Sequence, residues 1–185
     1  MLFRSIGVVS FASAASLVQP PTENREDILT AIDRFTMQRG TAIGSGIIVS
    51  LATIFPDAGI DITQYLYGSG GDSTRDFSRR KGDEKSKAET KEKPFRKVAP
   101  GSHNSAAIIL LTDGQRTTGP DPMQAAKMAA DRGVRVYPVG VGTKEGNPIG
   151  YEGWSMRVKL DEEVLMQIAN VTAGEYFYAG NAADL

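Results

Sequence analysis

The chain has 185 residues, of which 41% are hydrophobic, so it is long enough for one domain with a substantial core and short for two. Lysine and arginine total 21 against 22 for aspartate and glutamate, and this balance gives no overall reason to expect a nucleic acid or an anionic membrane as the partner. Because cysteine is absent, disulfides, thiolate metal sites and cysteine nucleophiles are excluded, and no apolar run reaches the roughly 20 residues of a membrane span.

The first segment, residues 1–18, fits two interpretations. Its apolar start and the stretch Ala12-Ser13-Ala14 imitate a secretory signal with a cleavage site. Ile6 and Val8 instead fit a buried strand that ends in a loop before Pro20-Pro21. We favour the strand, because the segment has only one basic residue and its apolar stretch is diluted by glycine and serine.

Two helices are expected in the next part of the chain. Apolar residues at helical spacing predict a helix over residues 24–35, with Thr22 as its cap. A glycine-rich loop over residues 39–46 follows, and the apolar run Ile47–Phe55 predicts a buried helix that stops at Pro56.

Residues 68–100 differ in kind from the rest. They contain ten lysine or arginine and six aspartate or glutamate residues, with few apolar ones, so they bury too little surface to offset the entropy of ordering. We expect a mobile charged insertion, and the remainder of the chain is acidic. Positive and negative residues are interleaved without a pattern of stacking aromatics, so we do not expect the insertion to bind nucleic acid.

The second half alternates strands with helices. The apolar run 106–111 predicts a strand covered on both faces, a helix is expected over 122–132 up to Gly133, and a strand follows over 134–139. A last helix is expected to open at Asp161-Glu162-Glu163.

Gly174 is expected to cap that last helix, and residues 175–179 should form a closing strand. Strands that alternate with helices predict an α/β fold with a mostly parallel sheet and helices on both faces. Ligands of such sheets bind beyond the carboxyl ends of the strands.

Two side chains stand where a ligand of such a sheet would bind. Asp113 follows directly on the strand over 106–111, so its carboxylate could bind a hard cation or a cationic group. Thr41 offers a hydroxyl at the mouth of a helix. Each has a structural alternative, because Asp-Gly pairs are common in turns and threonine is an ordinary N-cap.

Several phrases in order resemble a von Willebrand factor type A domain of the bacterial membrane-associated kind. Residues 6–12 resemble that family's second core strand, residues 40–44 its threonine loop, and residues 108–114 its aspartate loop. Stretches 134–142 and 161–177 continue the resemblance to the end of the chain.

The resemblance implies one Rossmann-like, doubly wound domain over residues 1–185, with the insertion at 68–100. The family's first strand, which ends in an Asp-x-Ser-x-Ser loop, should lie before Met1, and that motif occurs nowhere in the sequence. We therefore expect the sequence to be part of a longer protein.

In that family, a metal-ion-dependent adhesion site takes its ligands from the Asp-x-Ser-x-Ser loop, a threonine and an aspartate. The resemblance assigns the last two positions to Thr41 and Asp113. With the first loop missing, we expect Mg²⁺, Mn²⁺ or Ca²⁺ to bind weakly or not at all.

The function that the resemblance implies is a non-enzymatic protein-binding or assembly module. An acidic side chain of a protein partner would complete the coordination of the cation, and the place implied for such a protein is the bacterial cell envelope. Two alternatives remain: a structural domain without metal, and a dinucleotide-binding oxidoreductase that uses Gly140, Gly142 and Gly146. The second lacks the helix that should follow the glycines, because residues 147–153 have the composition of a loop.

Overall fold

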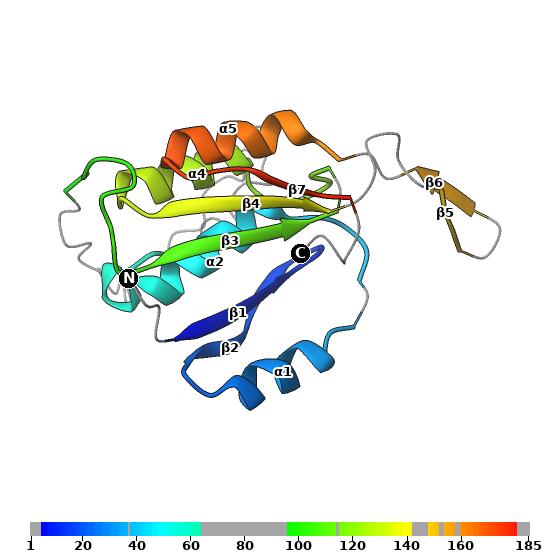
Figure 1. Cartoon of the computed structure of the whole chain (residues 1–185), viewed down its shortest axis with the longest axis horizontal. Coiled ribbons are helices and arrows are strands. Elements are labelled where there is room, and N and C mark those ends of the chain that lie inside the picture. The colour runs from blue at the N-terminus through cyan, green and yellow to red at the C-terminus, as the bar shows by residue number, and fades with distance from the viewer. Residues whose placement is uncertain are drawn as a thin grey trace, which may run out of the picture.

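The computed structural model describes residues 5–36, 38–63, 96–113, 115–141, 148–151, 154–157 and 160–180. In chain order its elements are β1 (Ile6–Phe11), β2 (Ala15–Thr22), α1 (Arg25–Asp33), α2 (Ile43–Ile54), the short 3-10 helix η1 (Pro56–Ala58), β3 (Ala107–Thr112), α4 (Pro122–Asp131), β4 (Arg135–Val141), β5 (Pro148–Tyr151), β6 (Trp154–Arg157), α5 (Glu162–Thr172) and β7 (Phe177–Ala179). Figure 1 shows the helices α2, α4 and α5 as a layer against three strands, with the β1–β2 pair and α1 beside them.

The main sheet is parallel, as the alternation of strands and helices predicts. Its strand order is β3-β4-β7, and β4 pairs with β3 from Ala107↔Arg135 to Thr112↔Gly140. β7 pairs with the end of β4, from Val139↔Phe177 onward. All three carboxyl ends therefore lie at one edge of the sheet, and the predicted α/β class is confirmed.

One hydrophobic core holds the sheet and the helical layer together. It joins buried side chains of α2, α4 and α5 to those of β3 and β4, among them Ile47, Ala126, Ile168, Leu110 and Val136. α2 has eight buried residues, which matches its expected place in the interior. Within the described residues no helix is long and apolar enough to cross a bilayer.

Strand β3 is covered on only one face by the described residues, although its continuous apolar run predicts burial on both. Ile108 and Leu110 are 6% and 3% exposed, whereas Ile109 and Leu111 are 67% and 48% exposed. The alternation follows from the pleat, which points successive side chains to opposite faces. The helical layer lies on the side of Ile108 and Leu110.

The two last long helices begin where the sequence predicts. The Asp121 side chain accepts a hydrogen bond from Met123 N at α4, and Asp161 accepts one from Val164 N at α5. The predicted cap at Gly174 is displaced by one residue, because Ala173 is the left-handed residue, with φ 55°. At the first helix, Asn24 and not Thr22 is the N-cap.

A strand was expected at β1, but its partner was not. The predicted loop after residue 11 is in fact β2, which pairs antiparallel with β1. Pro20 and Pro21 lie inside β2 because this strand is at the edge of its sheet, where a missing N–H breaks no ladder.

A second hairpin replaces the loop predicted over residues 147–153. β5 and β6 pair antiparallel, from Pro148↔Arg157 to Tyr151↔Trp154. They form a sheet of their own, separate from the parallel one.

Most of the charged insertion predicted at 68–100 lies outside the described residues. Its last part, residues 96–100, lies against the end of α4, where Val98 N donates to Asp131 O at 2.9 Å and Lys97 Nζ is 2.8 Å from an Asp131 carboxylate oxygen. The single domain over residues 1–185 and the mobility of the insertion remain expectations.

Candidate functional site

Three loops meet at the carboxyl edge of the strands. The loop before α2 contacts the end of β1, since Ala42 N donates to Ala12 O at 2.7 Å. It also contacts the loop after β3, where Thr117 N donates to Thr41 O at 3.1 Å and Thr117 Oγ1 accepts from Thr41 N at 2.8 Å. Segments distant in sequence are thereby fixed next to one another at the place where ligands of parallel sheets bind.

Glycines allow this close approach. Gly40 has φ +92°, a left-handed conformation that side-chain-bearing residues rarely adopt, and a Cβ there would lie 3.2 Å from Ser13 Cα. Gly44, in the first turn of α2, lies against the Pro120 carbonyl oxygen, which a Cβ would overlap. The glycine-rich loop in the sequence therefore packs protein against protein.

Thr41 lies half-buried in this loop, and it is not the cap of α2. The N-cap is Ala42, which makes no side-chain cap hydrogen bond. Among the described residues, the Thr41 hydroxyl donates to and accepts from none, because its only hydrogen bonds are those of its backbone to Thr117. The structural alternative for this threonine is therefore wrong.

Asp113 is exposed one residue beyond the end of β3. It does not cap the next helix, because Asp121 does so. No hydrogen bond joins Asp113 to Thr41 in the described part of the chain; both lie on loops of the same edge, and Thr117 follows Asp113 by four residues.

The N-terminus of α2 also lies at this edge. Its first turn has no acidic residue and no side-chain cap, so the positive end of the helix dipole is not neutralised locally. Backbone N–H groups at such a helix end favour a negatively charged group nearby.

Sequence reasoning missed Thr117, which holds the loop of Thr41 in place through its hydroxyl. The signal available was the polar run Gln115-Arg116-Thr117-Thr118 directly after a carboxyl strand end. Nothing in that run indicates which of its residues would contact the loop before α2, because the contact spans 76 positions.

The donor set at the edge is small. The described residues contain no group of three or more histidine, aspartate or glutamate side chains that could hold a metal ion. Hydroxyl and carboxylate oxygens are the right chemistry for Mg²⁺ or Ca²⁺, but these cations take six or more oxygen ligands. Any cation here needs ligands in addition to Thr41 and Asp113.

The glycines proposed for a dinucleotide-binding loop do not have the surroundings that such a loop needs. Gly140 lies inside β4, where a Cβ would come within 2.7 Å of Leu160 Cδ2 and of the Tyr176 hydroxyl. That hydroxyl donates to Glu162 Oε1 at 3.0 Å, and burial together with this carboxylate raises the pKa of Tyr176. Gly142 and Gly146 lie outside the described residues, and the next element is β5 instead of a helix.

Comparison with known proteins gives consistent matches. UPF0353 proteins of Nocardia farcinica and Mycolicibacterium gilvum are 29% and 28% identical to 98% of this chain. The chain spans about half the length of these curated relatives, 48% and 45% respectively.

Solved structures share the fold. BatB from Bacteroides thetaiotaomicron aligns with all of this chain and 76% of its own at a TM-score of 0.62 and 23% identity. An aerotolerance-related membrane protein from Bacteroides fragilis aligns with 97% of this chain and 75% of its own at 0.60 and 22%.

The family model of the von Willebrand factor type A domain matches residues 82–185, which is more than half of the chain. The match includes β3 with the following Asp113, and all the strands of the parallel sheet. The chain therefore belongs to the von Willebrand factor type A domain family.

Proposed function

We propose that this chain is a non-enzymatic protein-binding module whose binding edge is the carboxyl edge of its parallel sheet. The observation that carries the proposal is the meeting of the loops of Thr41 and Asp113 at this edge, beside the uncapped N-terminus of α2. A divalent cation, Mg²⁺ or in its place Mn²⁺ or Ca²⁺, is bound by the Thr41 hydroxyl and the Asp113 carboxylate, directly or through water.

The partner is a protein that presents an acidic side chain. Its carboxylate fills coordination positions that the chain leaves to water, and the positive end of α2 favours its approach. A fold neighbour supports a metal site in this fold. A structure of proximal thread matrix protein 1 from the mussel byssus is described with a zinc-occupied MIDAS (metal-ion-dependent adhesion site) motif, and it aligns at a TM-score of 0.51 and 19% identity.

Thermal unfolding tests the metal site. A cation that binds only the native state at ten times its Kd stabilises by about 1.4 kcal/mol, which raises the midpoint of a chain of this size by about 3–6 °C. We expect a rise of this order with Mg²⁺ or Mn²⁺ and none for Asp113→Asn.

The control variant is Asp57→Asn, which removes another exposed carboxylate, from η1 beyond the C-terminal end of α2. It should respond to the cation like the unmodified chain. An equal response of Asp113→Asn and Asp57→Asn would mean that any bound ion lies elsewhere.

A metal-free interaction domain is the second candidate, and the small donor set favours it. It predicts a cooperative unfolding transition whose midpoint is the same with EDTA and with 10 mM Mg²⁺. Under that outcome the carboxyl edge is still available to a partner, but recognition uses the exposed residues of the loops before α2 and after β3.

We place the protein at the bacterial cell envelope. The support is the fold shared with BatB and with a Bacteroides fragilis protein described as a membrane protein. Fractionation of cells that make the whole protein at its natural level tests this place; recovery in the cytosolic fraction alone would contradict it.

A further inference from the structure

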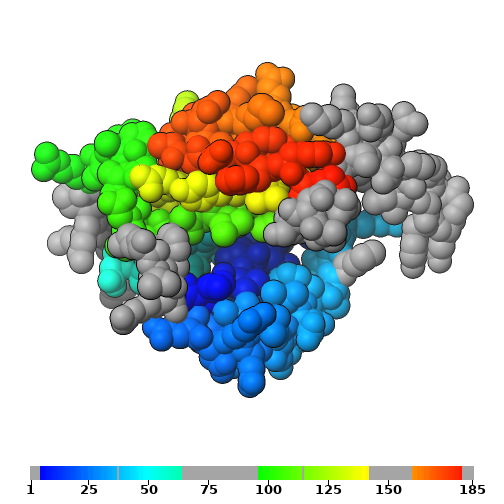
Figure 2. Space-filling model, viewed as in Figure 1, coloured from blue at the N-terminus to red at the C-terminus, as the bar shows by residue number. Residues whose placement is uncertain are grey.

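Thr41 and Thr117 are joined by two hydrogen bonds that run in opposite directions. Thr41 N donates to Thr117 Oγ1 at 2.8 Å, and Thr117 N donates to Thr41 O at 3.1 Å. The pair links the connection between α1 and α2 to the loop after β3, which also carries Asp113. In Figure 1 that connection (light blue) runs along the side toward which the arrows of β3 and β4 point, and Figure 2 shows light-blue atoms on the same side of the surface.

The backbone on either side of Thr41 is fixed as well. Gly40 has a left-handed conformation, and a Cβ there would lie 3.4 Å from Thr117 Oγ1. Ala42 is fully buried, and its N–H donates to Ala12 O at 2.7 Å. Three consecutive residues are therefore held by the rest of the chain, and rotation about the Cα–Cβ bond is the freedom left to the Thr41 hydroxyl.

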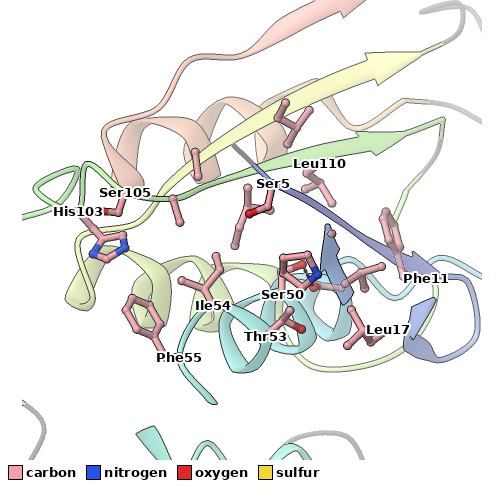
Figure 3. Close-up of a pocket in the computed structure, with 18 residues that line it drawn as sticks. Ser5, Phe11, Leu17, Ser50, Thr53, Ile54, Phe55, His103, Ser105 and Leu110 are labelled. Carbon is pink, nitrogen blue, oxygen red and sulfur yellow. Dashed lines mark hydrogen bonds between the residues drawn. The ribbon is translucent and has the colours of Figure 1, made fainter. Parts of the chain in front are cut away.

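The end of β1 supports the same arrangement. Phe11 is the last residue of β1, and Figure 3 shows its ring at that end of the strand. A Cβ on Gly46 of α2 would come within 3.0 Å of Phe11 Cδ1, so the ring and the helix are in close contact. The first turn of α2, and with it the loop that carries Thr41, is thus fixed against β1.

Only one of the two bonds between the threonines uses the Thr117 side chain. The bond from Thr117 N survives any substitution except proline, whereas the bond from Thr41 N needs an acceptor at Oγ1. Thr117 is exposed, so its methyl group contributes little to packing. Among the described residues its hydroxyl bonds to Thr41 N alone, which is a backbone group of the proposed cation site.

A cation site with few protein ligands depends on how well each ligand is placed before the ion arrives. A neutral threonine hydroxyl attracts a divalent cation less than a carboxylate does. If binding also had to order the Thr41 backbone, the entropy lost would offset much of this attraction. Groups that hold the ligands of a metal typically change its affinity by about 10–100-fold when they are replaced.

We propose that Thr117 is a positioning residue of the cation site. Its hydroxyl fixes the Thr41 backbone and so keeps the Thr41 hydroxyl in place for Mg²⁺ or Mn²⁺, while Thr117 itself does not contact the ion. The inference rests on the proposed cation-dependent function and adds to it a residue that the metal-ligand positions do not include.

The test measures the Kd of Mn²⁺ for the whole chain by water-proton relaxation. Thr117→Val removes the acceptor and keeps the shape, and Thr117→Ser keeps the acceptor. Thr118→Val is the control, because it removes a hydroxyl from the same loop whose side chain makes no hydrogen bond in the described part of the chain. We expect Thr117→Val to weaken Mn²⁺ binding about tenfold or more, Thr117→Ser to stay within about threefold and Thr118→Val within about twofold.

Amide hydrogen exchange at Thr41 in EDTA gives a second readout, which needs no metal. It should be faster in Thr117→Val than in the unmodified chain and nearly unchanged in Thr117→Ser, because only valine removes the acceptor of this N–H. Circular dichroism checks that each variant folds, and Thr117→Ala replaces Thr117→Val if the valine variant does not.

The outcomes separate this inference from the function on which it rests. Faster exchange at Thr41 with an unchanged Kd would show that Thr117 only holds the loop, and would overturn the positioning role while the cation site stands. An equal loss of affinity in Thr117→Val and Thr117→Ser would overturn it too, since serine keeps the hydroxyl. An unmodified chain that binds no Mn²⁺ would overturn the cation site and the positioning role together.

Discussion

Replacing Thr172 by valine tests how the backbone hydrogen bonds of β4 are satisfied where the short strand β7 does not reach. β7 pairs with β4 only from Val139↔Phe177 onward, so no described strand lies beside the earlier part of that edge of β4. There Val136 N donates to Thr172 Oγ1 at 3.1 Å, and this hydroxyl donates to Ile168 O at 2.8 Å. Thr172 is fully buried, so water cannot replace the hydroxyl.

The valine variant keeps the shape of the side chain and removes the acceptor. A buried N–H left without a partner costs about 1–3 kcal/mol. For a chain of this size, about 2 kcal/mol lowers the thermal midpoint by about 4–8 °C. The matched variant Thr172→Ser keeps the hydroxyl and loses one methyl group, which costs about 1 kcal/mol or about 2–4 °C.

Thermal and urea unfolding of both variants against the unmodified chain give the order of stabilities. We expect Thr172→Val to be the less stable of the two. A valine variant as stable as the unmodified chain, or a serine variant less stable than the valine variant, would refute the view that the hydroxyl stands in for a missing strand partner.

Three further predictions concern stability. Gly174→Ala should destabilise the fold far more than Gly59→Ala, because a Cβ at 174 would overlap the Val136 carbonyl oxygen of β4, whereas one at Gly59 would meet no atom within 4 Å. The urea unfolding midpoints of the two variants test this. Burial raises the pKa of Tyr176 in the folded chain, so above about pH 10 the unfolded chain loses this proton first and stability falls as pH rises. Tyr176→Phe removes the proton and should therefore reduce this fall in stability. Urea unfolding of both proteins from about pH 8 to 11 would show the difference. Ile108→Ala should cost about 2–5 kcal/mol and Ile109→Ala less than about 0.5 kcal/mol, since only the first is buried; equal losses would mean that both faces of β3 are covered.

The sequence predicts best where local chemistry decides the structure. Helical spacing from Pro122 onward, and Gly133 after it, predict α4 almost to the residue. The alternation of strands and helices predicts the parallel order of β3, β4 and β7. Asp113 is a candidate because it follows a carboxyl strand end, and Thr41 because it precedes a helix; their part in a metal site stays a prediction.

Elements that depend on distant partners are harder to predict from the sequence. β2 contains two prolines, and only its place at a sheet edge makes it a strand. The exposure of Ile109 cannot be predicted from an apolar run, because the run is equally suited to one covered face or two. The role of Thr172 depends on the length of β7, which no local pattern sets.

The position of α2 has a consequence for folding cooperativity. This helix contacts β1 and β2 on one side and β3 and α4 on the other, while in the described part of the chain the two sheets share no ladder. The β1–β2 hairpin with α1 is thus a unit that can separate from α2 while the core of α4, α5 and β4 stays closed. Native-state hydrogen exchange should divide the amides into two groups, with those of β4 opening only in global unfolding and those of the hairpin in a smaller, independent step.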